Sequence, residues 1–169
     1  MTAVFVHGVD ETARLWDDLR ARLFTDSIAV DLPGYGLGEA VDDHVDWLVR
    51  ELRGLGEPVH LVGHGWGALL VVRAVTAHPA TARSWVADRV GALASSVHTH
   101  WGAALSRPTR VPGLVLQPSL DPLDDLESSD YLAARLAART QRLDGLGHRW
   151  MVEEPGTAQV LERFWNSVV

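Results

Sequence analysis

Histidines, glycines and carboxylates gather where short apolar segments of this chain end. These segments are followed by His7-Gly8-Val9-Asp10, Gly63-His64-Gly65-Trp66-Gly67, Asp121-Pro122 and Gly147-His148. A carboxylate and a histidine on neighbouring loops can pair, so that the acid fixes the imidazole tautomer and stabilises its protonated form. Backbone N–H groups at a glycine-rich turn into a helix can bind an anion. Together they would place a general base beside an oxyanion-binding pocket.

Alternating strands and helices are predicted to position these residues. Apolar patterning predicts strands over 2–7, 27–32, 58–62, 84–88, 111–117 and 140–143, and helices over 12–23, 41–55, 68–77, 131–138 and 160–168. This order favours an α/β protein with one domain over 1–169: three αβα layers around a mainly parallel sheet of about six strands. Functional residues of such sheets lie in the loops at the carboxyl ends of the strands.

Composition excludes several kinds of chemistry. The 169 residues include 15 basic and 22 acidic side chains and no cysteine, so disulfides, thiolate metal sites and a cysteine nucleophile are excluded. Every basic residue is arginine, which excludes a Schiff-base or P-loop lysine, and the net charge of −7 argues against nucleic-acid binding. With no signal peptide and no long apolar run, we expect a cytoplasmic protein. The richness in Ala, Arg, Gly and Val indicates a bacterial gene of high GC content.

Five segments, taken in order, resemble the α/β-hydrolase family. They are Phe5-Val6-His7-Gly8, similar to the HG oxyanion loop; Asp31-Leu32-Pro33-Gly34-Tyr35-Gly36, similar to DxPGxG; Val59 to Gly67, similar to the nucleophile elbow; Gly113-Leu114-Val115-Leu116 leading to Asp121, similar to the acid-bearing strand; and Gly147-His148 with 151–155, similar to the histidine loop. The tryptophan after the elbow favours the epoxide-hydrolase and haloalkane-dehalogenase branch. No cofactor and no metal are expected.

The resemblance implies a set of site residues. His148 would be a general base oriented by Asp121, and the backbone N–H groups of Val9 and Trp66 would form the oxyanion hole. His7, Asp10, Trp66 and Trp150 are expected to line the substrate pocket. Flat apolar walls from the two tryptophans would suit an aromatic or polycyclic substrate.

The sequence departs from the family pattern in ways that bear on the chemistry. Gly65 stands at the nucleophile position, so the turn would persist without its reactive atom. Residues 90–110 are too few to form the helical cap domain of the family. The strand that leads into His7-Gly8 is the first in this sequence, whereas two strands normally precede it in the family. Asp10 stands where the family commonly has a proline. Gly65 is open to three interpretations: a natural loss of the nucleophile, an engineered inactivation, or a site that never needed one. We favour the natural loss because these other losses accompany it.

The leading hypothesis is therefore an enzyme without a covalent intermediate. His148 and Asp121 would act by general-base catalysis on a small carbonyl- or epoxide-type molecule, in a lyase, cyclase or hydrolase-type step. The first alternative is a non-catalytic binding or scaffold protein, with a second copy or a partner covering the pocket mouth and an exposed sheet edge at 27–32.

Weaker interpretations rest on single patterns. Gly63-x-Gly65-x-x-Ala68, with Asp88 twenty positions further on, satisfies the dinucleotide-binding pattern. His98 and His100 have metal-like spacing but no third ligand nearby, and Ser95 and Ser96 are substitute nucleophiles to consider.

Overall fold

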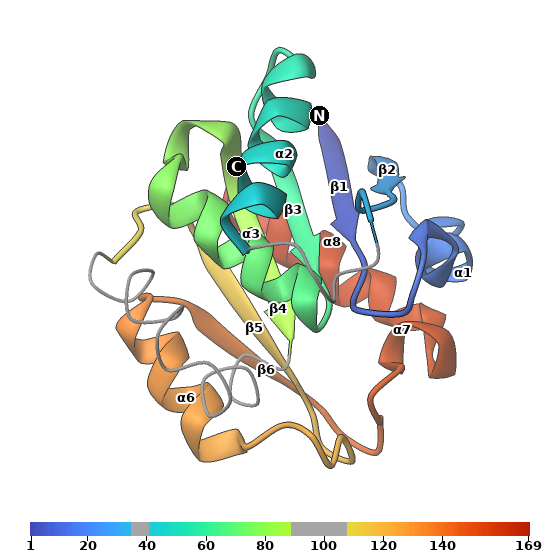
Figure 1. Cartoon of the computed structure of the whole chain (residues 1–169). Coiled ribbons are helices and arrows are strands. Elements are labelled where there is room, and N and C mark those ends of the chain that lie inside the picture. Colours follow the sequence, from blue (N-terminus) through green and yellow to red (C-terminus); the bar gives the residue numbers. More distant parts are fainter. Residues whose placement is uncertain (35–40, 89–107) are drawn as a thin grey trace.

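Six parallel strands form the centre of the protein in the computed structural model, which describes residues 1–34, 41–88 and 108–169. The strands are β1 (Thr2–Val6), β2 (Asp26–Val30), β3 (Val59–Gly63), β4 (Ala82–Asp88), β5 (Gly113–Pro118) and β6 (Arg139–Leu143). Their order in the sheet is β2-β1-β3-β4-β5-β6, and every neighbouring pair is parallel (Figure 1). The predicted six-stranded parallel sheet is confirmed, including the short strand near 140–143.

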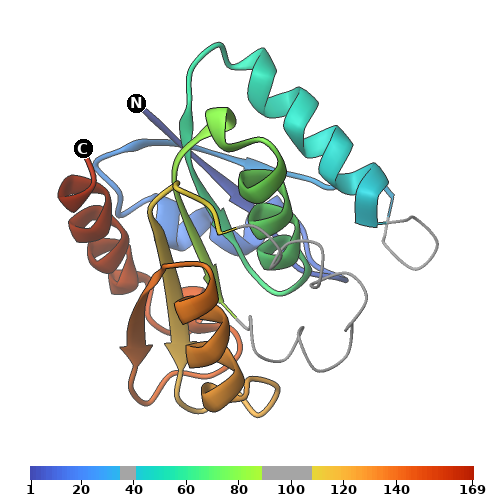
Figure 2. The same ribbon diagram turned by 90° about the vertical axis from the view of Figure 1, so that its left-hand side faces the viewer.

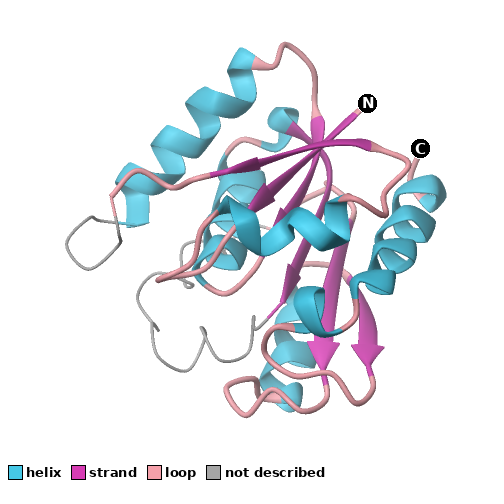
Figure 3. Cartoon of the chain, turned by 90° about the vertical axis from the view of Figure 1, so that its right-hand side faces the viewer, coloured by secondary structure: helices cyan, strands magenta, loops and turns pink. Residues whose placement is uncertain are grey.

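Helices cover both faces of the sheet, which gives the predicted three layers. They are α1 (Asp17–Arg20), α2 (Val41–Gly54), α3 (Trp66–Ala77), α6 (Leu126–Arg135), α7 (Trp150–Glu153) and α8 (Ala158–Ser167), joined by 3-10 turns η1 (Ala13–Trp16), η2 (Pro79–Thr81) and η3 (Pro155–Thr157). Helices α2, α3 and α6 pack on one face, and α1, α7 and α8 on the other (Figure 2 and Figure 3).

Alternating side chains of β1 show how the two cores form. Val4 and Val6 belong to the core beneath α2 and α3, whereas Ala3 and Phe5 face the core beneath α1, α7 and α8. Successive strand residues point to opposite faces, so a strand buried on both sides is apolar throughout. The carboxyl ends of all six strands therefore meet at one edge, as the sequence predicts.

Two predicted helices differ from those observed. The segment 12–23 is a 3-10 turn followed by a single α-helical turn. Helix α6 begins at Leu126, ahead of the predicted 131, because the Asp125 carboxylate accepts the backbone N–H of Ser128 and caps the helix. It ends early because Ala137 has a φ of 53°, outside the helical range.

Strand β2 lies at one edge of the sheet, as expected for the segment 27–32. Ile28 on this strand is 38% exposed. The expected lack of a cap concerns a segment that falls largely outside the described residues, and so do His98, His100, Ser95 and Ser96. No helix among the described residues is long and apolar enough to cross a membrane.

Candidate active site

The turn from β3 into α3 is built from glycines that allow close backbone contact. A Cβ on Gly63 would lie 2.4 Å from the carbonyl oxygen of Gly67, and one on Gly67 would lie 2.4 Å from the carbonyl oxygen of Val6. Between them Gly65 adopts φ 56° and ψ −117°, a conformation that side-chain-bearing residues rarely take. The chain thus keeps a sharp strand-to-helix turn with no side chain at its tip.

His148 and Asp121 form a hydrogen-bonded pair on the loops after β6 and β5. The two atoms, His148 Nδ1 and Asp121 Oδ2, are 3.2 Å apart, and the other carboxylate oxygen accepts the backbone N–H of Leu123 at 2.9 Å. The Asp121 side chain is fully buried, whereas that of His148 is 34% exposed. The structure therefore brings together the two residues predicted as base and acid, and it leaves the imidazole accessible.

Backbone hydrogen bonds hold these two loops together. Ser119 donates its N–H to the carbonyl of Leu143, and Leu120 donates to the carbonyl of Leu146 at 2.9 Å. The histidine loop is also tied to α7, because Gly147 donates its N–H to the Glu153 carboxylate at 2.8 Å. The position of His148 is consequently set by main-chain contacts that do not involve the β3–α3 turn.

A second histidine–carboxylate pair lies beside the first. His64 Nδ1 is 2.5 Å from Asp88 Oδ2, and both side chains are buried. Asp88 also accepts the indole N–H of Trp150 at 2.5 Å and the backbone N–H of Gly65 at 2.9 Å. Burial by itself raises the pKa of Asp88, but His64 and these two hydrogen bonds outweigh it and hold the pKa below its usual value. Asp88 is therefore a buried carboxylate, and His64 Nδ1 must be the donor to it.

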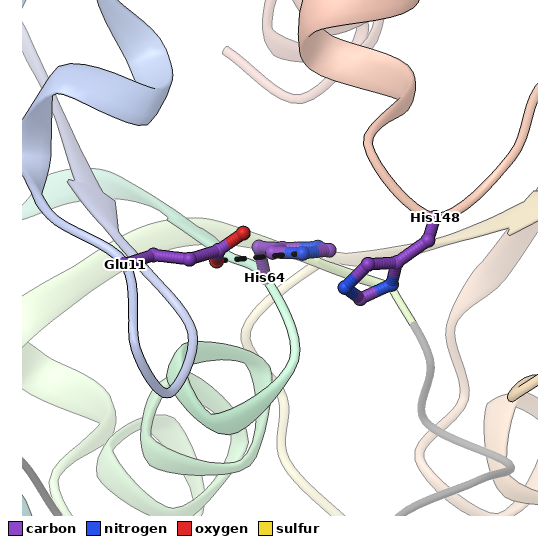
Figure 4. Close-up of side chains that lie close together, drawn as sticks. All are labelled: Glu11, His64 and His148. Atoms are coloured by element: carbon purple, nitrogen blue, oxygen red, sulfur yellow. Dashed lines mark ion pairs between the residues drawn. The ribbon is translucent and has the colours of Figure 1, made fainter.

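The two imidazole rings lie close together at an interplanar angle of 46°, and a third ionisable group contacts one of them. The His64 and His148 ring centroids are 4.7 Å apart, and Glu11 Oε2 lies 3.6 Å from His64 Nε2 (Figure 4). The same Glu11 oxygen accepts the backbone N–H of Gly8 at 3.1 Å. Trp16 packs edge-on against His64 with centroids 6.4 Å apart. Three loops thus bring Glu11, His64 and His148 to one place.

A small pocket lies between the loop after β1 and the start of α3, and its lining does not include Glu11, His64 or His148. His7, Asp10 and Trp66 are among the residues that line it, and the volume open to the centre of a water molecule is about 10 Å³, room for roughly one water. Both ring nitrogens of His7 are used by the backbone, one with the carbonyl of Gly8 at 2.7 Å and one accepting the N–H of Leu32 at 3.1 Å. His7 therefore contributes a wall to the pocket and holds the ends of β1 and β2 together.

The backbone positions expected to bind an oxyanion lie at the same pocket. Val9 lines it from the loop after β1, and Trp66 lines it from the first turn of α3. A helix's first N–H groups have no partner within the helix, so that of Trp66 is directed out of its amino end. The Trp66 indole is fixed by a 3.1 Å hydrogen bond to His44 Nδ1.

Two expectations from the sequence need correction. Trp150 does not line the pocket: it is fully buried in the core beneath α7, and its indole N–H is bound to Asp88. Asp88 is wholly inaccessible and its carboxylate already bonds His64, Gly65 and Trp150, so it is not available to a ribose. This removes the acidic residue on which the dinucleotide-binding alternative depended.

Sequence reasoning missed Glu11 and the partner of His64. Glu11 directly follows the His7-Gly8-Val9-Asp10 segment, so its place in a strand-end loop was a usable signal. Asp88 is the last residue of a predicted strand, which places it at the functional edge of the sheet.

Comparison with known proteins identifies the family. The sequence profile of the alpha/beta hydrolase family matches residues 3–105, more than half of the chain, and the protein belongs to this family. No curated protein sequence gives a significant match.

Solved structures share the fold at low sequence identity. A membrane phospholipase A described as a bacterial virulence factor superposes with a TM-score of 0.81 at 16% identity, covering 99% of this chain and 79% of that one. A Bacillus megaterium epoxide hydrolase gives 0.79 at 15% identity, covering 98% and 93%. NosK from Streptomyces actuosus gives 0.75 at 21% identity, covering 99% and 98%. These likenesses establish the α/β-hydrolase fold.

Proposed function

We propose that this protein is an α/β-hydrolase-fold enzyme that works by general-base catalysis without a covalent intermediate. The observation that supports this most directly is the His148–Asp121 pair at 3.2 Å. The exposed imidazole lies 4.7 Å from the ring of His64, the residue preceding Gly65. The base is thus held against the ring of the residue that precedes the tip of the turn.

The tautomer of His148 follows from its partner. An ionised carboxylate only accepts hydrogen bonds, so Asp121 fixes the proton on Nδ1 and leaves the Nε2 lone pair as the base. In this mechanism a water or a substrate hydroxyl takes the place of the missing nucleophile side chain and gives its proton to Nε2. A positioned base contributes about 10²–10⁴-fold to the rate.

The substrate class we propose is a small molecule with an electrophilic carbonyl or epoxide. The N–H groups of Val9 and Trp66 would stabilise the oxygen on which negative charge develops. An epoxide hydrolase and a phospholipase among the similar structures agree with this class of electrophile. A step of lyase or cyclase type would use the same base on a hydroxyl or an acidic C–H.

The experiment measures turnover of activated esters and epoxides in chelator-treated buffer. We expect turnover by the wild type, a loss of about 10²–10⁴-fold in His148→Ala, and a smaller loss in Asp121→Asn. His78→Ala is the matched control. This histidine lies at the carboxyl end of α3, the opposite end from the turn at Gly65, and it contacts Arg53. Intact-mass spectra of quenched reactions should show no adduct. Unchanged activity in His148→Ala, or an adduct on the wild type, would refute the mechanism.

The alternative function, a non-catalytic binding or scaffold protein, stays a prediction. Its structural support is the edge position of β2, where unpaired backbone groups can meet another chain. A strict monomer in light scattering, with no change on adding substrate analogues, would count against a partner at that edge.

A further inference from the structure

The geometry points to a divalent-cation site, best suited to Zn²⁺, formed by Glu11, His64 and His148. This inference goes beyond the proposed base mechanism. The three side chains come from loops after β1, β3 and β6, and they reach the same space (Figure 4). Two imidazoles and one carboxylate are a donor set that catalytic zinc sites use, with the fourth position left for water.

The distances are close to those a tetrahedral ion requires. One ligand atom from each side chain lies within 4.8 Å of the other two. Ligand atoms about 2.1 Å from a tetrahedral zinc are about 3.4 Å apart. Glu11 Oε2 and His64 Nε2, at 3.6 Å, already have this separation. Only the separations that involve His148 would have to shorten, and they would do so by rotation of its side chain, because main-chain hydrogen bonds hold its loop.

Each histidine is oriented as a metal ligand is. His64 Nδ1 is held by Asp88 at 2.5 Å and His148 Nδ1 by Asp121 at 3.2 Å. Metal-binding histidines characteristically donate their other ring N–H to a carboxylate, which fixes the tautomer and makes the ligating nitrogen more basic. His64 Nε2 also lies 3.6 Å from the Glu11 carboxylate, so two oriented imidazoles stand beside one carboxylate, which is more than one general base requires.

Charge also favours a cation here. Glu11, Asp88 and Asp121 place three carboxyl groups around two imidazoles, and the side chains of Asp88 and Asp121 are fully buried. Glu11 accepts the N–H of Gly8, so its charge lies at the loop expected to stabilise an oxyanion. A negative charge there opposes a developing anion, and a bound divalent ion would reverse that effect.

Gly65 follows His64 at the tip of the turn and carries no side chain that could serve as a further ligand. The fourth position of the ion would therefore be taken by water. A zinc-bound water there would have its pKa lowered to about 7 and could serve as the nucleophile. When the ion is bound, the His148 Nε2 lone pair is engaged by it, so activation of water passes from the base to the cation.

Metal binding is tested on untagged, chelator-treated protein titrated with Zn²⁺ and Co²⁺. We expect one equivalent bound by calorimetry, visible absorption bands typical of tetrahedral Co²⁺, and a rise in Tm with Zn²⁺. Glu11→Gln should weaken binding more than 100-fold, and Asp121→Asn by about 10–100-fold. Glu51→Gln and His78→Gln remove an exposed carboxylate and a histidine elsewhere and should bind as the wild type does.

The outcomes separate this inference from the proposed function. If the wild type binds no stoichiometric ion, or Glu11→Gln binds as tightly as Glu51→Gln, the cation site is refuted while the base mechanism stands. If the metal-free protein is inactive and Zn²⁺ restores turnover, the cation site stands and the unassisted base mechanism is refuted. Circular dichroism of each variant shows that lost binding does not come from unfolding.

Discussion

Replacing Gly65 by serine restores a nucleophile to the turn and tests whether His148 is positioned to activate it. The backbone at this position has φ 56° and ψ −117°, which costs a residue with a side chain about 1–3 kcal/mol. Reduced freedom of the unfolded chain returns about 0.4–1 kcal/mol. We therefore expect a net loss of about 1–2 kcal/mol, and a Tm lower by about 2–8 °C for a domain of this size.

The chemical consequence should be larger than the structural one. In Gly65→Ser the new hydroxyl would lie just after His64, whose ring centroid is 4.7 Å from that of His148, and the His148 Nδ1 is held by Asp121. We expect covalent labelling by a fluorophosphonate probe at least 10²-fold faster than in the wild type, because an adjacent base activates serine. Intact mass spectrometry in the presence of chelator measures this rate.

Two matched variants isolate the cause. Gly65→Ala carries the same backbone cost without a hydroxyl and should not be labelled. Gly65→Ser combined with His148→Ala keeps the hydroxyl and removes the base. If Gly65→Ser melts near Gly65→Ala but labels no faster than the double variant, His148 does not serve this turn, and the reasoning behind the base mechanism is wrong.

Three further predictions concern stability. Asp88→Asn should lower the free energy of unfolding by about 2–4 kcal/mol in urea, because three buried donors lose a charged acceptor, and a change below about 0.5 kcal/mol would contradict this. Burial, and then the charge of a neighbouring arginine, lowers the pKa of His60 from 6.5 to about 4. The free energy of unfolding should therefore be full above pH 6.5 and fall by at most about 3 kcal/mol towards pH 4, because the unfolded chain takes up the proton first. His60→Leu should flatten that part of the pH profile, and an unchanged slope would oppose the assignment. Gly67→Ala should cost more than about 3 kcal/mol or prevent folding, since its Cβ would lie 2.4 Å from a backbone oxygen, whereas Gly54→Ala, with nothing within 4 Å, should be neutral in thermal melts.

Strand and loop positions could be predicted from the sequence because they depend on local patterns. Runs of buried apolar residues mark the strands, and glycines mark the turns at their carboxyl ends. The pairing of His148 with Asp121 follows from the resemblance to the family and from the adjacency of β5 and β6. These features need no knowledge of the exact register between strands.

The His64–Asp88 pair could not be predicted because it depends on such a register. Val59 pairs with Ala82, but His60 pairs with Ser84, so an irregularity shifts the two strands by one residue. Without that shift the residue following β3 would lie opposite Ala87 instead of Asp88. A bulge leaves no clear signal in apolar patterning, yet it decides which side chain His64 meets.

Trp150 was misplaced for a different reason. It lies two residues from His148 in the sequence, which suggested a shared pocket. It begins α7, and its ring packs on Trp16 with centroids 5.9 Å apart. Closeness along the chain does not decide which way a side chain points, because a loop can turn into a helix within two residues.

The main-chain bonds between the loops after β5 and β6 have a consequence for protein engineering. They hold His148 and Asp121 without any contribution from residue 65. A reactive side chain can therefore be introduced at the turn while the rest of the machinery keeps its position. A series of variants at this single position could carry glycine, alanine, serine, aspartate or cysteine on the same scaffold. Differences in rate across the series would measure what the nucleophile itself contributes to catalysis.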